Sequence, residues 1–245
     1  MATAFVYHPD FHRHETRHGH PERGERLDAV VEALETAGLR ERMRELAFEP
    51  APLAALTAVH EPAFVELVEM ACAEGLGSVG SPDTHICPSS YHVATLASGG
   101  VIAACDAVMA GEVANAFCAV RPPGHHAEAD RATGFCLFNH IAVAAQHLVD
   151  HHKLSRVAVV DFDVHHGNGT QHLFEDRRDV LYVSLHEAPG TLLYPGTGMA
   201  HERGRGDGEG CVLNIPMPAR SGDAAFVAAF EEQVEPALDA FAPEF

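Results

Sequence analysis

The sequence predicts a three-layer α/β/α fold built around a mostly parallel sheet. Short runs of β-branched residues alternate with longer stretches of helical periodicity, and three of the runs are almost continuously apolar. Strands that are buried on both faces of a parallel sheet have this character. The predicted strands are 4–7, 116–121, 157–163, 180–186 and 212–216. The predicted helices are 25–37, 62–74, 90–110, 138–151 and 223–241. In such folds ligands bind beyond the carboxyl ends of the strands.

Length and composition suit one globular domain spanning residues 1–245. The chain is 47% hydrophobic and 21% charged, and its 16 basic and 35 acidic residues give a net charge of −19. This balance argues against nucleic-acid binding through a basic surface, although a cationic substrate fits it. No apolar run approaches 18 residues, so no membrane span is expected. The six cysteines show no C-x-x-C spacing, and no leader is evident, so a reducing cytoplasm is expected. The oligomeric state is not predicted.

The segment after the predicted strand 157–163 concentrates groups that bind metals. Asp161, Asp163 and His165 alternate, so they share one face if the extended conformation continues past the strand. Gly167 and Gly169 then allow a tight loop. Unpaired buried carboxylates are costly, and a divalent metal compensates for them. Because zinc accepts both carboxylate oxygen and imidazole nitrogen, this strand end is a candidate zinc site.

A second candidate segment, Arg121-Pro122-Pro123-Gly124-His125-His126, also follows a predicted strand. The prolines stiffen the loop, and its adjacent imidazoles can then be held in fixed orientations. An imidazole that is oriented by a partner at one nitrogen can carry protons at the other. We therefore expect His125 and His126 to act as a proton-transfer pair.

Most of the 19 histidines are expected to be ordinary surface or loop residues. The N-terminal histidines fit no single ligand pattern, and a polar, solvated loop is favoured for them: His8, His12, His14, His18 and His20. A surface role is likewise favoured for those on or just past the helix 138–151: His140, His147, His151 and His152. Cys136 is expected to be a packed thiol and not a nucleophile.

Several motifs, in order along nearly the whole chain, resemble the histone deacetylase family. They are HPERGERL (20–27), RPPGHHAE (121–128), GFCLFN (134–139), VVDFDVHHGNGTQHLFED (159–176) and LYVSLHE (181–187). The resemblance is strongest to the class II-like branch of bacterial deacetylases and acetylpolyamine amidohydrolases. It implies the arginase/deacetylase-like form of the α/β fold and a zinc-dependent amidohydrolase.

The resemblance implies specific roles in catalysis. Asp163 and His165 correspond to two of the three ligands of one zinc ion. His126 corresponds to the general base that later acts as a general acid, and His125 to its electrostatic and hydrogen-bonding partner. A three-ligand zinc site leaves a position open for water and substrate.

Further residues support these groups in the family pattern. Asp161 would orient His125, and Asn168 would orient His126. The residues implied to bind the acyl-lysine-like substrate are Gly134, Phe135 and Tyr194. A structural monovalent cation, K⁺, is implied at Asp161, Asp163, His165, Ser184 and Leu185.

The chain departs from the family pattern at its C-terminal end. Its 245 residues contain neither a Gly-Phe-Asp-type turn, which carries the third zinc ligand, nor a Gly-Gly-Tyr-type loop, which carries the oxyanion tyrosine. We therefore expect a C-terminally truncated catalytic domain that lacks its last strands and helices. Such a chain is expected to be weakly active or inactive by itself.

Two other functions remain open. A binuclear arginase-type hydrolase would need an Asp two residues after His165, but Gly167 stands there. A non-catalytic module that binds an acyl ligand would not need the intact pairs His125/His126 and Asp163/His165. For the deacetylase, the substrate could be an acetylated amine, a polyamine or an acetyl-lysine.

Overall fold

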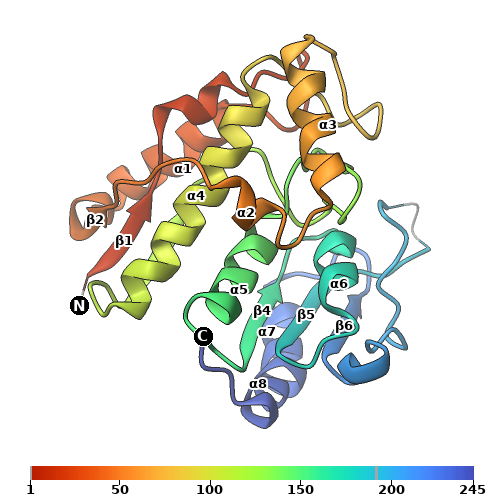
Figure 1. Ribbon diagram of the computed structural model, residues 1–245. Coiled ribbons are helices and arrows are strands. Elements are labelled where there is room, and N and C mark those ends of the chain that lie inside the picture. The colour runs from red at the N-terminus through yellow and green to blue at the C-terminus, as the bar shows by residue number, and fades with distance from the viewer. Residues whose placement is uncertain (1, 191–192) are drawn as a thin grey trace. The chain divides into compact units, whose positions relative to one another are not determined.

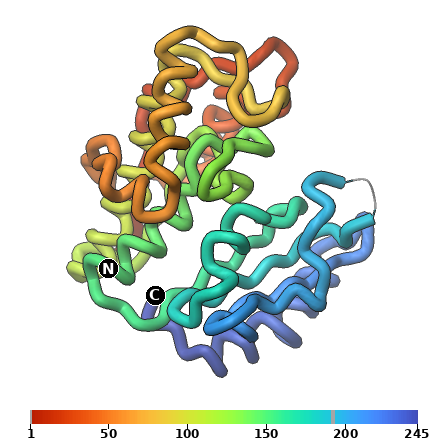
Figure 2. The backbone as a smooth tube through the Cα atoms, turned by 45° about the vertical axis from the view of Figure 1, so that its right-hand side comes forward, coloured from red at the N-terminus to blue at the C-terminus, as the bar shows by residue number. Residues whose placement is uncertain are grey.

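The computed structural model describes residues 2–190 and 193–245, in which helices and strands alternate along most of the chain (Figure 1; the same backbone is traced in Figure 2). Contacts divide the chain into two compact units, residues 1–144 and 145–245. The elements up to the end of β3 are β1 Thr3–Val6, η1 Pro9–Arg13, α1 Glu25–Thr36, η2 Arg40–Arg42, β2 Met43–Glu45, α2 Leu53–Leu56, α3 Pro62–Ala73, α4 Ser90–Met109 and β3 Asn115–Cys118. Those that follow are α5 His140–Asp150, β4 Val157–Asp161, α6 Asn168–Phe174, β5 Val180–Glu187, η3 Gly206–Gly208, β6 Val212–Met217, α7 Asp223–Ala229, η4 Phe230–Val234 and α8 Glu235–Phe241.

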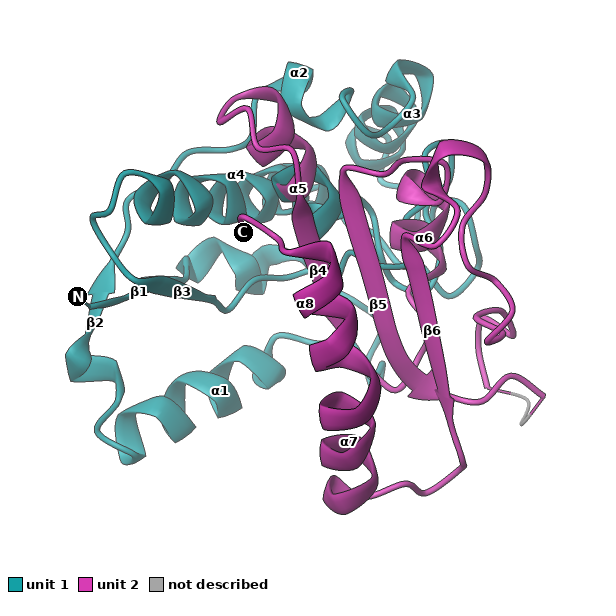
Figure 3. Ribbon diagram, turned by 90° about the horizontal axis from the view of Figure 1, so that it is seen from below, with its two compact units in different colours: residues 1–144 teal, residues 145–245 magenta. Residues whose placement is uncertain are grey.

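The first unit contains a parallel sheet of order β2-β1-β3. Side chains alternate across β1: Phe5 belongs to a core cluster with Leu27 of α1, whereas Ala4 packs in another cluster with Ala107 of α4. The two helices lie on opposite sides of the strands (Figure 3). The unit therefore has helices on both faces of a parallel sheet.

The second unit repeats this plan with the order β4-β5-β6, again all parallel. Strand β5 is buried from Val180 to His186, as expected for a central strand. One face of β5 packs in a core cluster with residues of α7, η4 and α8, and α6 also packs against β5. The last residue, Phe245, lies beside the start of β4, where its carbonyl accepts a hydrogen bond from the Ala158 N–H (3.0 Å).

The predicted class, an α/β fold of parallel strands flanked by helices, is confirmed. All five predicted strands are present, and their hydrogen bonds form two three-stranded sheets, one in each unit. The predicted helix 223–241 is continuous, but its middle turn, Phe230–Val234, is a π-helix. Strand β2 and helix α6 are not among the predicted elements. With three and seven residues, they are too short to show a clear periodic pattern in the sequence.

Helix α4 is buried along much of its length. It approaches other backbone closely at Gly99, where a Cβ atom would collide with the Glu49 carbonyl. Among the described residues it is the one helix long and apolar enough to cross a membrane, yet 61% of its apolar window is buried inside the protein. Core helices pass the same test of length and composition, so this is weak evidence for a span.

Candidate active site

The loop that carries the predicted histidine pair follows β3 in the first unit. Its Arg121–Pro122 peptide bond is cis. The ring centres of His125 and His126 are 4.0 Å apart, with the planes inclined by 45°. His126 is buried, with 4% of its surface exposed, whereas His125 is half-buried. The structure thus holds the two imidazoles side by side.

His140, for which a surface role is predicted, is instead buried behind this loop. Its Nδ1 lies 2.8 Å from Ser98 Oγ, and its Nε2 lies 3.0 Å from the Pro122 carbonyl. The loop also approaches the backbone here, because a Cβ on Gly124 would lie 2.8 Å from the His140 amide nitrogen. Burial lowers the pKa of His140 to about 4, although its bond to Pro122 opposes the shift. A neutral imidazole therefore fixes the start of the loop.

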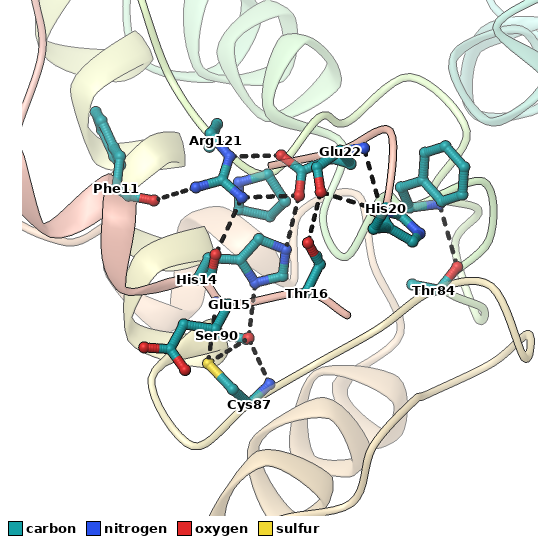
Figure 4. Close-up of polar contacts among 12 residues, drawn as sticks. Phe11, His14, Glu15, Thr16, His20, Glu22, Thr84, Cys87, Ser90 and Arg121 are labelled. Carbon is teal, nitrogen blue, oxygen red and sulfur yellow. Dashed lines mark hydrogen bonds and ion pairs between the residues drawn. The ribbon is translucent and has the colours of Figure 1, made fainter. Parts of the chain in front are cut away.

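A buried ion pair holds the residue before the cis bond (Figure 4). The Arg121 guanidinium donates from Nε to Glu22 Oε1 (2.5 Å) and from Nη2 to Glu22 Oε2 (2.9 Å). It also donates to the carbonyls of Phe11 (2.8 Å) and His14 (3.0 Å). This bidentate pair, joined to two backbone carbonyls, links the N-terminal segment to the loop.

His14 completes this network, so its predicted place in a solvated loop is wrong. Its Nδ1 lies 2.7 Å from Ser90 Oγ and its Nε2 3.4 Å from Glu22 Oε2. Burial by itself would raise the pKa of Glu22, but the hydrogen bonds from His14 and Arg121 bring it down to about 2. Glu22 therefore stays ionised and keeps both partners in place.

The predicted substrate-binding residues Gly134 and Phe135 form a tight turn in the same unit. The turn is closed by bonds between Thr133 and Cys136, whose thiol is fully buried as predicted. Both Gly134 (φ 57°) and Phe135 (φ 70°) have left-handed backbone. A Cβ on Gly134 would collide with the His126 ring. The glycine is thus required both by its dihedral angle and by the imidazole that packs on it.

Replacing Gly134 with alanine is expected to destabilise the first unit and to displace His126. Gly38→Ala is a matched control, because Gly38 has a similar φ of 64° but nothing within 4 Å of its Cβ position. The control should lose about 1 kcal/mol from the left-handed backbone alone. Gly134→Ala should lose more in urea unfolding and should shift the NMR signal of the His126 ring. Equal losses with an unmoved His126 signal would contradict the packing described.

In the second unit, β4 ends at Asp161, and the residues predicted to bind a metal, Asp163 and His165, follow in a turn. The strand predicted to reach residue 163 ends two residues earlier, and residues 163–165 bend, so the extended conformation does not continue to His165. Asp161 Oδ1 accepts a bond from the Asp163 N–H (3.1 Å), and Asp163 Oδ1 accepts one from the His165 N–H (2.8 Å). These side-chain–backbone bonds are typical of aspartate turns.

The turn still brings the two predicted zinc ligands together. His165 Nδ1 lies 2.9 Å from Asp163 Oδ1, and the side chains are 36% and 50% exposed, respectively. Asp161 is anchored on its other oxygen, where Oδ2 accepts a bond from the Tyr182 hydroxyl (3.1 Å). Asn168 is buried at the start of α6.

Buried polar side chains form a hydrogen-bonded layer next to this turn, and its histidines, His166 and His186, were not singled out from the sequence. His166 Nδ1 lies 2.8 Å from Thr197 Oγ1, and its Nε2 lies 2.9 Å from Gln171 Oε1. On β5, His186 bonds to Ser184 Oγ and to the Gly198 carbonyl, both at 2.8 Å. The alternation of Tyr182, Ser184 and His186 in an otherwise apolar strand is the signal that could have revealed this face.

Burial governs the ionisation of this layer. Burial, together with the neighbouring His186, lowers the pKa of His166 to about 4. Burial also lowers the pKa of His186 and raises that of Tyr182 well above 10, where the nearby Asp161 adds to the effect. Both imidazoles are therefore neutral near pH 7. The Tyr182 hydroxyl stays protonated and donates its hydrogen bond to Asp161.

The other predicted residues of this unit are placed as follows. Ser184 and Leu185 are buried on β5, and Ser184 is the register partner of Asp161. Tyr194 is 40% exposed and precedes a cis peptide bond to Pro195. A K⁺ ion on the predicted set, Asp161, Asp163, His165, Ser184 and Leu185, stays a prediction. The predicted site residues thus form two groups: those up to Phe135 belong to the first unit, and those from Asp161 to the second.

Residues 20–245 match the model of the histone deacetylase domain. A probable deacetylase of Archaeoglobus fulgidus is 39% identical over 100% of this chain and 67% of its own length. The histone deacetylase-like amidohydrolase of Pseudomonas aeruginosa is 41% identical over 92% of the chain and 59% of its own.

A human relative and a solved structure are similar to the chain as well. The human polyamine deacetylase HDAC10 is 40% identical over 100% of this chain and 38% of its own length. The crystal structure of the HDA15 HD domain superposes with a TM-score of 0.94 at 38% identity, covering 100% of this chain and 71% of that one. The chain thus spans two thirds or less of the curated relatives named here. Because the family model matches most of its residues, the chain belongs to the histone deacetylase family.

Proposed function

We propose that this chain carries the metal-binding and proton-transfer residues of a zinc-dependent deacetylase. The reaction is hydrolysis of the amide of an acetylated amine, an acetylated polyamine or an acetyl-lysine. Two of its relatives are named as a polyamine deacetylase and an amidohydrolase, which supports this substrate class. The net charge of −19 also suits a cationic substrate.

The observation that carries the proposal is the pairing of Asp163 with His165. Their facing atoms, Oδ1 and Nδ1, lie 2.9 Å apart on partly exposed side chains. Two atoms that bind one tetrahedral zinc ion at about 2.0–2.2 Å lie about 3.4 Å apart. The Asp163–His165 contact is a hydrogen bond at 2.9 Å, so a small separation of the two atoms would let them share a single ion. Carboxylate oxygen and imidazole nitrogen are also donor types that zinc accepts. The pair therefore fits a zinc ion.

Different residues of the chain serve different steps of the proposed hydrolysis. When bound, zinc would polarise the scissile carbonyl and lower the pKa of the attacking water. His126 accepts the proton of that water at a ring nitrogen and returns it to the leaving amine. His125 lies against it and stabilises the charge that develops. In the family pattern, Asp161 and Asn168 would orient the two imidazoles, and Gly134, Phe135 and Tyr194 would hold the substrate chain. The structural K⁺ ion belongs to the same proposal.

Zinc stoichiometry tests the metal site. The Asp163→Asn variant should retain one zinc ion per chain fewer than the unmodified chain, as measured by mass spectrometry after dialysis. The control variant His201→Gln, at an exposed histidine of the same unit, should bind as much zinc as the unmodified chain. Unchanged zinc in Asp163→Asn would overturn the assignment of this ligand. Two manganese ions at this site would favour the binuclear arginase-type alternative.

A further inference from the structure

Three histidines gather at the C-terminal end of α5, outside every residue given a role above. His147 lies in the last turn of the helix, and His151 and His152 follow its end. The His151 N–H donates to the His147 carbonyl (2.8 Å), so the helical turn continues through this segment. Residues four apart on a helical turn lie on the same side, which explains why these two rings meet. Lys153 then ends the turn with a left-handed φ of 60°.

All three rings are neighbours of one another. The ring centres of His147 and His151 are 4.9 Å apart, those of His151 and His152 5.1 Å, and those of His147 and His152 5.4 Å. Ring nitrogens of His147 and His152 lie within 4.8 Å of each other. Three imidazoles bound to one tetrahedral ion at about 2.0–2.1 Å place their ring centres about 5 Å apart. The ring centres therefore already have the spacing that a shared metal ion requires, whereas the His151 ring nitrogens lie outside the group of ligand atoms within 4.8 Å of one another and have to turn toward the other two.

The surroundings favour a cation that is open to solvent. His151 is exposed, and His147 and His152 are half-buried, so an ion can reach the cluster without opening the core. The C-terminal end of a helix carries the negative end of its dipole, which favours positive charge there. Imidazole is a ligand that suits zinc, copper and nickel ions, whereas calcium and magnesium prefer oxygen.

We propose that His147, His151 and His152 form a second metal site, which binds a divalent ion of the zinc, copper or nickel class. The near-parallel rings of His147 and His151, inclined by 14°, need only a rotation of the exposed His151 side chain to share an ion with His152. The site is separate in sequence from Asp163 and His165 and does not depend on the proposed catalytic role.

Zinc counting on four variants of the 245-residue chain tests this site. The unmodified chain should bind two zinc ions, and the double variant His151→Gln/His152→Gln should bind one. Asp163→Asn should also bind one, whereas the combined variant should bind none. The control His201→Gln should bind two. Circular dichroism identifies any variant that does not fold.

The pattern separates this proposal from the proposed function. If His151→Gln/His152→Gln binds as much zinc as the unmodified chain, the second site is overturned, whatever Asp163→Asn does. If only Asp163→Asn leaves zinc binding unchanged, the catalytic assignment fails and the histidine site stands. A second readout uses Ni²⁺ alone, which should broaden the ring-proton NMR signals of His147 and His152. Loss of this broadening in the double variant is expected, and its persistence would contradict the site.

Discussion

The purified 245-residue chain should deacetylate N-acetylputrescine and acetyl-lysine peptides at least ~10²–10³-fold more slowly than the Pseudomonas aeruginosa amidohydrolase measured in parallel, since loss of an oxyanion donor alone has about this effect. Its residues include two that are proposed here as zinc ligands, Asp163 and His165, and neither the Gly-Phe-Asp-type nor the Gly-Gly-Tyr-type segment of the family pattern. Steady-state turnover with saturating zinc gives the comparison.

The residual activity itself should depend on the groups proposed here. His126→Ala should lower it by a further ~10²-fold or more, because a positioned proton carrier contributes at least that much. His201→Gln, far along the chain and exposed, should leave it unchanged. Turnover equal to that of the Pseudomonas aeruginosa relative would show that the absent segments are not needed. Activity that survives His126→Ala would remove this histidine from the mechanism.

Stability should fall steeply between pH 6.5 and pH 4. Burial lowers the pKa of His60, His140 and His166 to about 4, against 6.5 for an exposed imidazole. Below pH 6.5 the unfolded chain therefore binds more protons than the folded one, so the stability that these groups contribute is present above pH 6.5 and is lost as pH falls toward 4. Each contributes on the order of 3 kcal/mol at neutral pH. Urea unfolding at pH 7, 6 and 5 measures the loss.

Both units should show this acid sensitivity, because His60 and His140 belong to the first and His166 to the second. His60 Nδ1 lies 2.8 Å from the Glu128 carbonyl, and its Nε2 accepts a bond from the Asn139 N–H (2.9 Å). His60→Gln should lower stability at pH 7 and flatten its decline below pH 6.5. The exposed control His201→Gln should leave the pH profile unchanged. A profile that is flat down to pH 4 would contradict buried, neutral imidazoles.

Much of the fold and of the candidate site could be predicted from local patterns. The apolar run 157–160 followed by acidic residues and glycine marked the end of β4, and the stiff Pro-Pro-Gly segment marked the histidine loop. Side-chain alternation predicted that Asp163 and His165 would meet. They do meet, but through an aspartate turn, because bonds from backbone N–H groups to Asp161 and Asp163 replace the strand.

The buried histidines could not be predicted, because their partners are distant in sequence. Ser90 is 76 residues from His14, and Ser98 is 42 from His140. A single sequence shows the imidazole but not the hydroxyl or carbonyl that makes its burial favourable. For the same reason the Glu22–Arg121 pair, 99 residues apart, has no local signal.

Cobalt-induced NMR shifts test most directly the claim that His125, His126, Asp163 and His165 act in one reaction. The experiment uses His151→Gln/His152→Gln, so that Co²⁺ binds at Asp163 and His165 alone. The proposal predicts large paramagnetic shifts of the His125 and His126 ring protons, and their loss when Asp163→Asn is added. Shifts confined to His165 and its neighbours, with the His125 and His126 signals unmoved, would contradict it.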